Sequence, residues 1–166
     1  MVKILIDTNI WIDYLGGVAE ASAVLENSDD VGMSAITYAE VASGCTPAEL
    51  ALFESMLNVG RALGTIQIIH TNDAIIKLAA AYNHNSATGS GHGRKRLPDA
   101  IIGATAVLTG RTLFTRNAHD FKQVDIHTPY QGQWIKRDVN GTPTKTWVPQ
   151  AAVFPDQAIE PAQPKK

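Results

Sequence analysis

Short apolar segments alternate with segments of helical character along most of this chain, and this alternation limits the folds that it can adopt. The apolar segments are residues 2–6, 31–34, 65–69, 111–115 and 124–126. The first is broken only by Lys3, as is typical of a parallel strand that is buried on both faces. Strands that alternate with helices predict an α/β fold, with helices covering both faces of a central parallel sheet of four to five strands.

The ranges between these strands carry helix signals. Thr8 or Asn9 is expected to cap the first helix, and Thr37 to open the third. Proline suits the first turn of a helix, which places helix starts at Pro47 and Pro98. A Gly-rich, basic stretch, residues 83–97, predicts a loop. The expected helices are 8–15, 19–26, 37–44, 47–61, 71–82 and 99–108.

Composition narrows the class of protein. The chain has 166 residues, 45% of them hydrophobic, and a formal net charge of -2. This length suits one ordinary domain with a sizeable core, and no apolar run approaches the ~18 residues of a membrane span. The first residues turn charged too soon for a signal peptide, and the single cysteine, Cys45, fits a reducing cytoplasm. We therefore expect a cytoplasmic protein without a membrane segment.

A change in composition near Thr128 predicts a boundary. Residues 1–127 hold 9 basic and 13 acidic side chains, whereas residues 128–166 hold 5 and 3 and contain six of the eight prolines. We expect a folded domain over 1–127, followed by an extended, proline-rich C-terminal tail over 128–166. Trp134 and Trp147 lie in this tail, and the sequence leaves open whether they contact the domain, another chain or RNA.

Four acidic residues stand at the edges of apolar or small-residue segments: Asp7, Glu40, Asp99 and Asp120. A carboxylate near a core costs several kcal/mol unless it is paired, hydrogen-bonded or bound to a metal. Ligands of parallel sheets bind outside the carboxyl ends of the strands, and Asp7 directly follows a strand. A shared divalent cation explains all four carboxylates at once.

Each acid also has a structural explanation. Asp7 is suited to cap a helix, and Thr37 with Glu40 fits a capping box. Asp99, beside Pro98, suits the positive end of a helix dipole, and Asp120 suits a solvated turn. Taken singly, these explanations are at least as good as the metal hypothesis, but together they leave the common position of the four acids unexplained.

Four sequence segments carry a family resemblance. They are Ile-Asp7-Thr-Asn-Ile-Trp-Ile, Ser-Ala-Ile-Thr-Tyr-Ala-Glu40-Val, Pro-Asp99-Ala-Ile-Ile-Gly-Ala-Thr-Ala and Leu-Phe-Thr115-Arg-Asn117-Ala-His-Asp120-Phe. In this order they resemble the PIN-domain ribonucleases, and most closely the VapC toxins of type II toxin–antitoxin modules. The resemblance covers residues 2–127 and implies a PIN-like α/β/α sandwich with Asp7 on its central strand.

The resemblance also implies chemistry. Asp7, Glu40, Asp99 and Asp120 would bind Mg²⁺ or Mn²⁺ and catalyse RNA hydrolysis that leaves a 5′-phosphate and a 3′-hydroxyl. Thr8, Asn9, Thr115 and Asn117 would form a supporting polar shell. The implied partners are an RNA substrate, a cognate antitoxin and a second copy of the chain. Hard divalent cations prefer oxygen ligands, and the chain offers no Cys/His cluster for zinc.

A basic stretch of the predicted loop is a candidate for RNA binding. Arg94, Lys95 and Arg96 suit either an RNA backbone or a solvated loop.

Three other functions remain open. A stand-alone RNA-processing nuclease and a non-catalytic RNA-binding module share the same fold. A phosphohydrolase of the haloacid-dehalogenase type also starts from a strand-end Asp, but it needs a second Asp where this chain has Asn9. Metal-dependent cleavage would separate an enzyme from a binding module.

Overall fold

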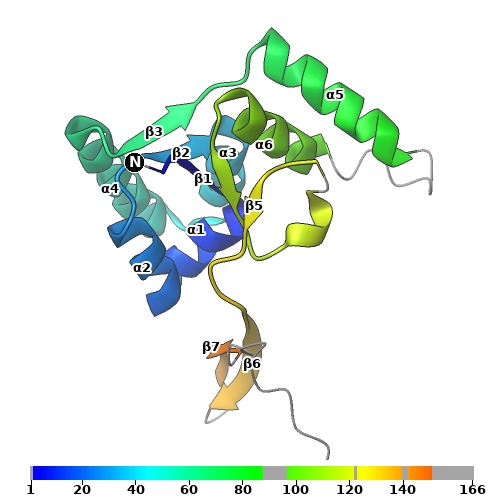
Figure 1. The fold of residues 1–166 in the computed structure, drawn as a ribbon. Coiled ribbons are helices and arrows are strands. Elements are labelled where there is room, and N and C mark those ends of the chain that lie inside the picture. Colours follow the sequence, from blue (N-terminus) through cyan, green and yellow to red (C-terminus); the bar gives the residue numbers. More distant parts are fainter. Residues whose placement is uncertain (1, 88–96, 122, 140–141, 151–166) are drawn as a thin grey trace, which may run out of the picture. The chain divides into compact units, whose positions relative to one another are not determined.

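A five-stranded parallel sheet forms the centre of the first part of the chain (Figure 1). The computed structural model describes residues 2–87, 97–121, 123–139 and 142–150. The strands are β1 (Ile4–Ile6), β2 (Val31–Ser34), β3 (Ile66–Ile69), β4 (Thr112–Phe114) and β5 (Ile126–His127). The helices are α1 (Thr8–Leu15), α2 (Ala19–Glu26), α3 (Ala35–Gly44), α4 (Pro47–Leu63), α5 (Asp73–Ala87), α6 (Leu97–Leu108) and the 3-10 helix η2 (Ala118–Asp120).

Strand order places β1 at the centre of the sheet. The order is β3-β2-β1-β4-β5, and every neighbouring pair is parallel. Ile4 of β1 is in register with Val31 of β2 on one side and with Thr112 of β4 on the other. The α/β prediction with a parallel sheet of four to five strands is confirmed. Asp7, the residue after β1, therefore lies at the carboxyl edge of the sheet with a strand on either side.

Successive side chains of each strand point to opposite faces of the sheet and pack into two separate core layers. Leu5 and Leu113 pack against Ile102 and Ala106 of α6. The next residues along each strand point to the opposite face. In the helical layer formed by α1 and α4, the rings of Trp11 and Phe53 pack edge to face with centroids 5.9 Å apart. Burial of apolar side chains in both layers is the main stabilising contribution to such a sandwich.

Trp11 corrects one expectation of the sequence. From the sequence, Trp11 together with Ile12, Tyr14 and Leu15 would form an apolar patch for a partner chain if these side chains were partly exposed. Trp11 is instead fully buried, and only Ile12 of this group is strongly exposed, at 49%. The aromatic ring of Trp11 belongs to the core because it meets Phe53 and Tyr14 edge to face. The patch is thus smaller and less apolar than the sequence indicates.

Two helices differ in their bounds from the sequence prediction. The helix expected to end at Tyr82 continues as α5 to Ala87, so its last turn replaces the start of the expected loop. The side chain of Asn72, rather than Thr71, accepts a hydrogen bond from the Ile75 amide and caps this helix. Among the described residues, no helix is both long and apolar enough to cross a bilayer.

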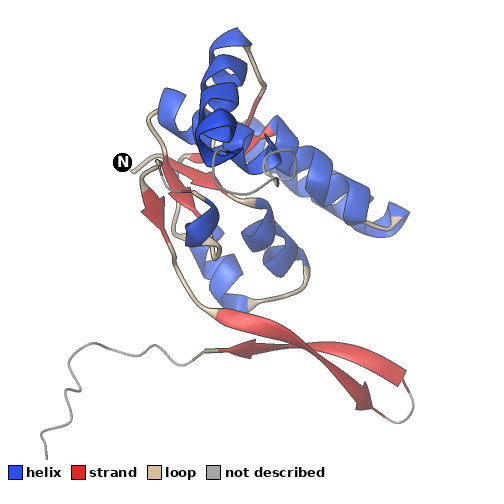
Figure 2. Cartoon of the chain, turned by 90° about the vertical axis from the view of Figure 1, so that its right-hand side faces the viewer, coloured by secondary structure: helices blue, strands red, loops and turns tan. Residues whose placement is uncertain are grey.

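A second unit begins at Tyr130 and is built on an antiparallel hairpin, β6 (Gly132–Val139) with β7 (Thr142–Pro149) (Figure 2). The sequence predicts an extended tail here, whereas the structure forms these two strands. Asn140-Gly141 in the sequence is a strong signal for a two-residue hairpin turn. The many prolines of the tail concealed this signal, although proline is tolerated on the open edges of sheets.

Candidate active site

Asp7 is anchored between the two central strands. Its backbone amide donates a hydrogen bond to the carbonyl of Phe114 in β4 at 3.0 Å. Asp7 is buried, with only 5% of its surface exposed. Asp7 is also the N-cap of α1, because Oδ1 accepts a hydrogen bond from the Thr8 amide at 2.7 Å. The expectation that Thr8 or Asn9 caps this helix is therefore wrong, and those residues are available for other contacts.

Two neighbouring side chains hold the second oxygen of Asp7. Nδ2 of Asn9 and the hydroxyl of Thr115 each donate to Oδ2 at 2.7 Å, and they contact each other at 3.1 Å. An ionised carboxylate has about four acceptor positions, and three of those on Asp7 are taken. The remaining position is on Oδ1. The polar side chains around Asp7 thus orient the carboxylate and leave it able to take one more ligand.

Burial and neighbouring negative charges both raise the pKa of the Asp7 carboxyl. Burial raises the pKa of this carboxyl above 3.8, while hydrogen bonds from Thr115 and Thr8 lower it. The charges of Glu40 and Asp120 raise the pKa again, and the net shift is upward. Because both charges act on Asp7, the three carboxylates belong to one acidic cluster. A cation would relieve this repulsion and lower the free energy of the ionised cluster.

Glu40 reaches this cluster from the second turn of α3. The cap of α3 is Ser34, whose hydroxyl accepts hydrogen bonds from the amides of Ile36 and Thr37. The hypothesis that Thr37 and Glu40 form a capping box is therefore wrong. Oε2 of Glu40 instead accepts a hydrogen bond from the Thr8 hydroxyl at 2.5 Å. Glu40 is directed towards the start of α1, next to Asp7.

Asp120 is held by the loop that follows β4. The Asn117 side-chain amide donates to Oδ2 of Asp120, and the Asn117 backbone amide donates to the Thr115 hydroxyl at 3.0 Å. Thr115 therefore connects Asp7 with the segment that carries Asp120. His119 lies 3.3 Å from Asp120, but the His119 side chain is 77% exposed. This exposure indicates that the His119 side chain faces the solvent.

The placement of Asp99 follows from the direction of α6. Asp99 is partly buried in the first turn of this helix. The end of α6 lies at the amino edge, because Gly110 and Arg111 lead straight into β4. The helix spans 12 residues, about 18 Å at 1.5 Å per residue, and returns antiparallel to the strands. Its N-terminus therefore lies towards the carboxyl edge, the side on which Asp7 lies.

An ion pair that was not predicted from the sequence lies beside this cluster. Asp13 of α1 is completely buried, and its carboxylate contacts Nε of Arg116 at 2.5 Å and the Nη2 of Arg116 at 3.2 Å. The Arg116 amide also donates to Oδ1 of Asn9 at 3.2 Å. Asn9 and Asp13 are four residues apart on one helical face, and both contact Arg116. This pair fixes the exit of β4 against α1.

Two expected features lie outside what the structure shows. Arg94, Lys95 and Arg96 fall in residues 88–96, which are not among the described residues. Within the described ranges, no three His, Cys, Asp or Glu side chains are close enough together to hold a metal ion. The cluster of Asp7, Glu40 and Asp120 is thus a set of acids that influence one another, not a finished coordination sphere.

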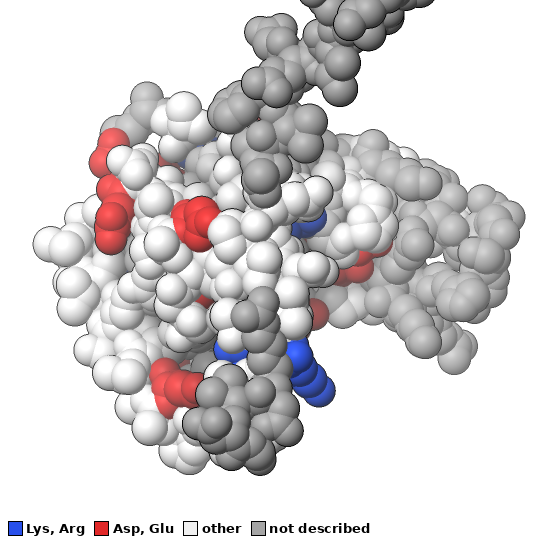
Figure 3. Space-filling view, turned by 90° about the horizontal axis from the view of Figure 1, so that it is seen from below, with Lys and Arg blue, Asp and Glu red and all other residues white. Residues whose placement is uncertain are grey.

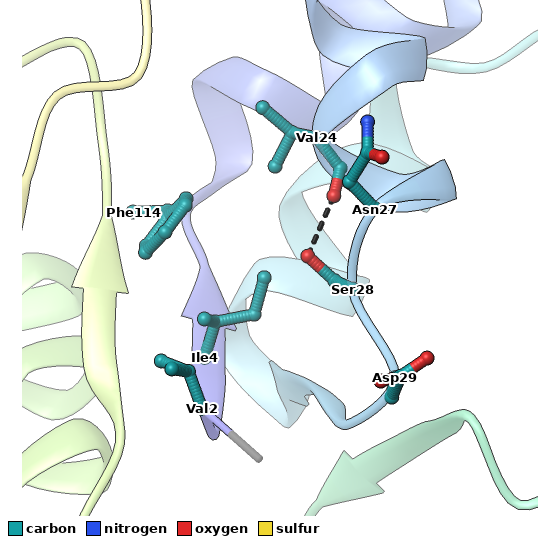
Figure 4. Close-up of a pocket in the computed structure, with 7 residues that line it drawn as sticks. All are labelled: Val2, Ile4, Val24, Asn27, Ser28, Asp29 and Phe114. Atoms are coloured by element: carbon teal, nitrogen blue, oxygen red, sulfur yellow. Dashed lines mark hydrogen bonds between the residues drawn. The ribbon is translucent and has the colours of Figure 1, made fainter.

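A cavity of about 320 Å³ lies away from these acids (Figure 4). It opens between the start of β1, the end of α2 and the ring of Phe114. The Ser28 hydroxyl on its wall already donates to the carbonyl of Val24 at 2.6 Å. Its walls are mostly apolar, and none of the predicted site residues contributes to them. The lining residues are Val2, Ile4, Val24, Asn27, Ser28, Asp29 and Phe114.

The comparisons with known proteins assign the family. The family model for the PIN domain matches residues 4–127, which is the part of the chain that holds the sheet and the acidic cluster. The chain belongs to the PIN domain family. This finding confirms the family resemblance of the four motif segments. No curated protein shows a significant match.

Solved structures extend this result. A toxin–antitoxin complex from Klebsiella pneumoniae contains a chain that is 34% identical, with a TM-score of 0.61 over 78% of this chain and 99% of that one. FitAcB from Neisseria gonorrhoeae is 24% identical, with a TM-score of 0.58 over 76% and 97%. VapBC-1 from nontypeable Haemophilus influenzae is 21% identical, with a TM-score of 0.55 over 78% and 98%. The latter two similarities show the fold, and the first supports a VapC-like PIN protein.

Proposed function

We propose that this PIN protein is a metal-dependent endoribonuclease and the toxin of a type II toxin–antitoxin module. The observation that carries the proposal is the buried Asp7 carboxylate, which lies at the carboxyl edge of the central strand and is affected by the charges of Glu40 and Asp120. Folding several carboxylates close together costs free energy unless a cation is bound. PIN domains are generally nucleases, which supplies the reaction class.

The chemistry of the donor set fits Mg²⁺ or Mn²⁺. All candidate ligands are carboxylate oxygens, which hard divalent ions prefer. Asp7, Asp99 and Asp120 are the proposed ligands, and Glu40 is proposed either to bind the ion or to orient the attacking water. Asp7 retains one acceptor position on Oδ1, which suits a single metal contact. When bound, the ion would activate water and offset the negative charge of the phosphodiester.

The polar neighbours have positioning roles in this proposal. Asn9 and Thr115 fix the rotation of the Asp7 carboxylate through Oδ2, and Thr8 directs Glu40 towards the same side. Asn117 restrains Asp120. When the side chains of a site are oriented before the substrate binds, less binding free energy is lost in ordering them. The proposed products carry a 5′-phosphate and a 3′-hydroxyl, with water as the nucleophile.

Partners follow from the relatives. The Klebsiella pneumoniae structure described above is a toxin–antitoxin complex, which supports a protein antitoxin for this chain. We propose that the cognate antitoxin blocks the acidic cluster by inserting an Arg or Lys side chain, because a charged hydrogen bond to clustered carboxylates is strong. A homodimer and a cytoplasmic location complete the proposal. Absence of any neighbouring gene product that suppresses activity would favour a stand-alone RNA-processing nuclease.

The decisive experiment measures cleavage of structured RNA by the full-length chain. Activity is expected with Mg²⁺ or Mn²⁺ and is expected to stop when EDTA is added. Asp7→Asn and Asp99→Asn should each abolish cleavage, because Asn matches Asp in shape but lacks its charge. Asp29→Asn is the matched control, because Asp29 is an exposed acid just before β2, at the amino edge of the sheet. Full activity in excess chelator, or in Asp7→Asn, would refute the proposal.

A further inference from the structure

The β6–β7 hairpin is an addition to the PIN domain that the family similarity does not explain. The family match ends at residue 127, and the Klebsiella chain is covered over 99% of its length by 78% of this chain. The hairpin begins at Gly132. Its sequence carries Lys136, Arg137 and Lys145 against one acid, Asp138, in contrast to the acidic balance of residues 1–127.

Backbone hydrogen bonds decide which hairpin side chains share a face. The Gln150 amide donates to the Gln131 carbonyl at 2.9 Å, so this pair is a hydrogen-bonded pair. Hydrogen-bonded and non-hydrogen-bonded pairs alternate along an antiparallel ladder. Trp134 opposite Trp147 and Lys136 opposite Lys145 are therefore both non-hydrogen-bonded pairs, in which side chains approach most closely. Both pairs lie on the same face of the hairpin.

Aromatic rings gather at one end of this face. The ring centroids of Trp134 and Trp147 are 5.6 Å apart, and those of Tyr130 and Trp147 are 5.9 Å apart. A Cβ atom on Gly132 would lie only 2.3 Å from the Trp147 ring, so glycine lets that indole lie flat against β6. Both indoles remain partly exposed. The rings stabilise the hairpin and also leave an aromatic surface open to solvent.

The two lysines next to this surface make an unfavourable pair on their own. Lys136 and Lys145 are directly opposite each other, and both side chains are exposed. Like charges at opposite positions of a sheet destabilise it, whereas an anion bound between them would reverse the sign of the interaction. Same-face positions are about 6.8 Å apart along a strand. A phosphate near the lysines is thus within one nucleotide of a base on the indoles.

We propose that the face formed by Trp134, Trp147, Lys136 and Lys145 binds single-stranded RNA, with bases stacked on the indoles and phosphates near the lysines. Single-strand binding surfaces combine these two features, because stacking requires unpaired bases and cations follow the backbone. Figure 3 shows one face of the molecule, where both acidic and basic side chains reach the surface. Residues 1–127 hold more acidic than basic side chains, so the lysines of the hairpin add positive charge that favours a polyanion. The choice of RNA rests on the proposed function.

Tryptophan fluorescence of the full-length chain tests this proposal directly. The chain has three tryptophans, and Trp11 is fully buried, so a fluorescence change on RNA addition reports on Trp134 and Trp147. The probe is a single-stranded oligoribonucleotide of about 12 nucleotides, and EDTA is present throughout so that binding is measured without cleavage. Stacking should quench the fluorescence, and the same RNA annealed to its complement should quench it much less.

Charge variants keep the aromatic pair intact. Lys136→Gln with Lys145→Gln should weaken binding and reduce the slope of log K against log salt by about 1.4, at ~0.7 for each phosphate contact. The matched control is Arg61→Gln with Lys77→Gln, which removes the same charge from exposed positions on α4 and α5 and should leave the slope unchanged. Circular dichroism from the coupled Trp134 and Trp147 rings verifies that each charge variant keeps the hairpin.

The outcomes are distinguishable. Equal slopes for the two double variants, or no quenching by single-stranded RNA, would overturn the proposal even if the chain cleaves RNA. If the lysine variant instead changes the sedimentation of the chain while RNA leaves the fluorescence unchanged, the face binds a second copy and the proposal fails. Quenching with the expected loss of slope supports it even if no cleavage is found, in which case only the nuclease proposal falls.

Discussion

The hydroxyl of Thr8 donates a hydrogen bond to Glu40 across 2.5 Å and thereby connects the first turn of α1 with the second turn of α3. These helices follow β1 and β2, which are neighbouring parallel strands. Both helices therefore begin at the same edge of the sheet, and residues 32 positions apart in sequence meet there. Glu40 is available for this contact because Ser34, and not the Thr37–Glu40 pair, caps α3.

Substitutions at the start of α3 test this assignment of the cap. Ser34→Ala should lower the free energy of unfolding by about 1 kcal/mol, because two amides lose their acceptor. Thr37→Val should not destabilise the protein and should stabilise it by about 1 kcal/mol, because the Thr37 hydroxyl is buried and has no hydrogen-bond partner among the described residues. Urea unfolding measures both values. Loss of stability in Thr37→Val with none in Ser34→Ala would restore the capping box.

Much of the fold, and the position of Asp7 at the carboxyl edge of the sheet, were predictable from the sequence, for a physical reason. Strand β1 is short and apolar, and the polar residue Asp7 follows it directly. The local sequence pattern alone therefore locates the carboxyl end of this strand, where ligands of parallel sheets bind. The capping role of Ser34 was not predicted, because Ser34 is both the last residue of β2 and the N-cap of α3. The local sequence pattern assigns a residue to a strand or to a helix cap, but not to both. The Asp13–Arg116 pair was missed because it joins residues 103 positions apart through tertiary packing.

Metal binding should be detectable without any substrate. Asp7→Asn should leave the metal-free protein at least as stable as the natural sequence, because the substitution removes a buried charge that Glu40 and Asp120 repel. Mg²⁺ or Mn²⁺ should raise the melting temperature of the unchanged chain and have much less effect on Asp7→Asn. At a hundredfold excess over Kd, the expected stabilisation is about 2.7 kcal/mol.

Differential scanning fluorimetry with a metal titration provides this measurement. Asp29→Asn serves as the control and should respond to metal like the unchanged chain. Ca²⁺ provides a second comparison, because it also takes oxygen ligands but tolerates looser geometry than Mg²⁺. An equal rise in melting temperature for Asp7→Asn would place the metal elsewhere and remove Asp7 from the ligand set.

The Asp13–Arg116 pair should matter for stability. Asp13 is fully buried and Arg116 is 19% exposed at its side chain. Asp13→Ala should cost about 3 kcal/mol, because it leaves the Arg116 charge without its carboxylate. The double variant Asp13→Leu with Arg116→Met should recover most of that loss, since it replaces both charged side chains by apolar ones. Urea unfolding of the two variants and of the unchanged chain gives these differences, and an undiminished stability in Asp13→Ala would contradict this role.

The amino edge of the sheet has a second ion pair with a measurable pH dependence. Nη2 of Arg111 contacts Oδ1 of Asp30 at 2.7 Å. Burial raises the pKa of Asp30, but the hydrogen bond and the charge of Arg111 outweigh burial and the net pKa lies below 3.8. A lowered pKa means that the ionised carboxylate stabilises the folded chain above the pKa of the unfolded state, about 3.9, and that this contribution is lost as pH falls through the folded pKa.

Asp30→Asn isolates that contribution. The variant should be less stable than the unchanged chain at pH 6–7, and the difference should shrink as the pH falls below about 4. Asp73→Asn, an exposed acid in the first turn of α5, is the comparison for non-specific acid effects. Urea unfolding between about pH 3 and pH 7 gives the difference directly. A difference that is constant across this range would show that the Arg111–Asp30 contact does not depend on the carboxylate charge.

Removal of the hairpin should leave the PIN domain folded. Residues 1–129 contain the whole five-stranded sheet and both core layers, and they form a compact unit of their own. A chain ending at Pro129 should therefore unfold cooperatively with a melting temperature close to that of the full chain. Under the RNA-binding proposal, truncation should raise KM for single-stranded substrates and leave kcat nearly unchanged, because the acidic cluster is intact. An insoluble truncated chain, or one whose kcat falls while KM is unchanged, would show that residues beyond 129 complete the core or the active site.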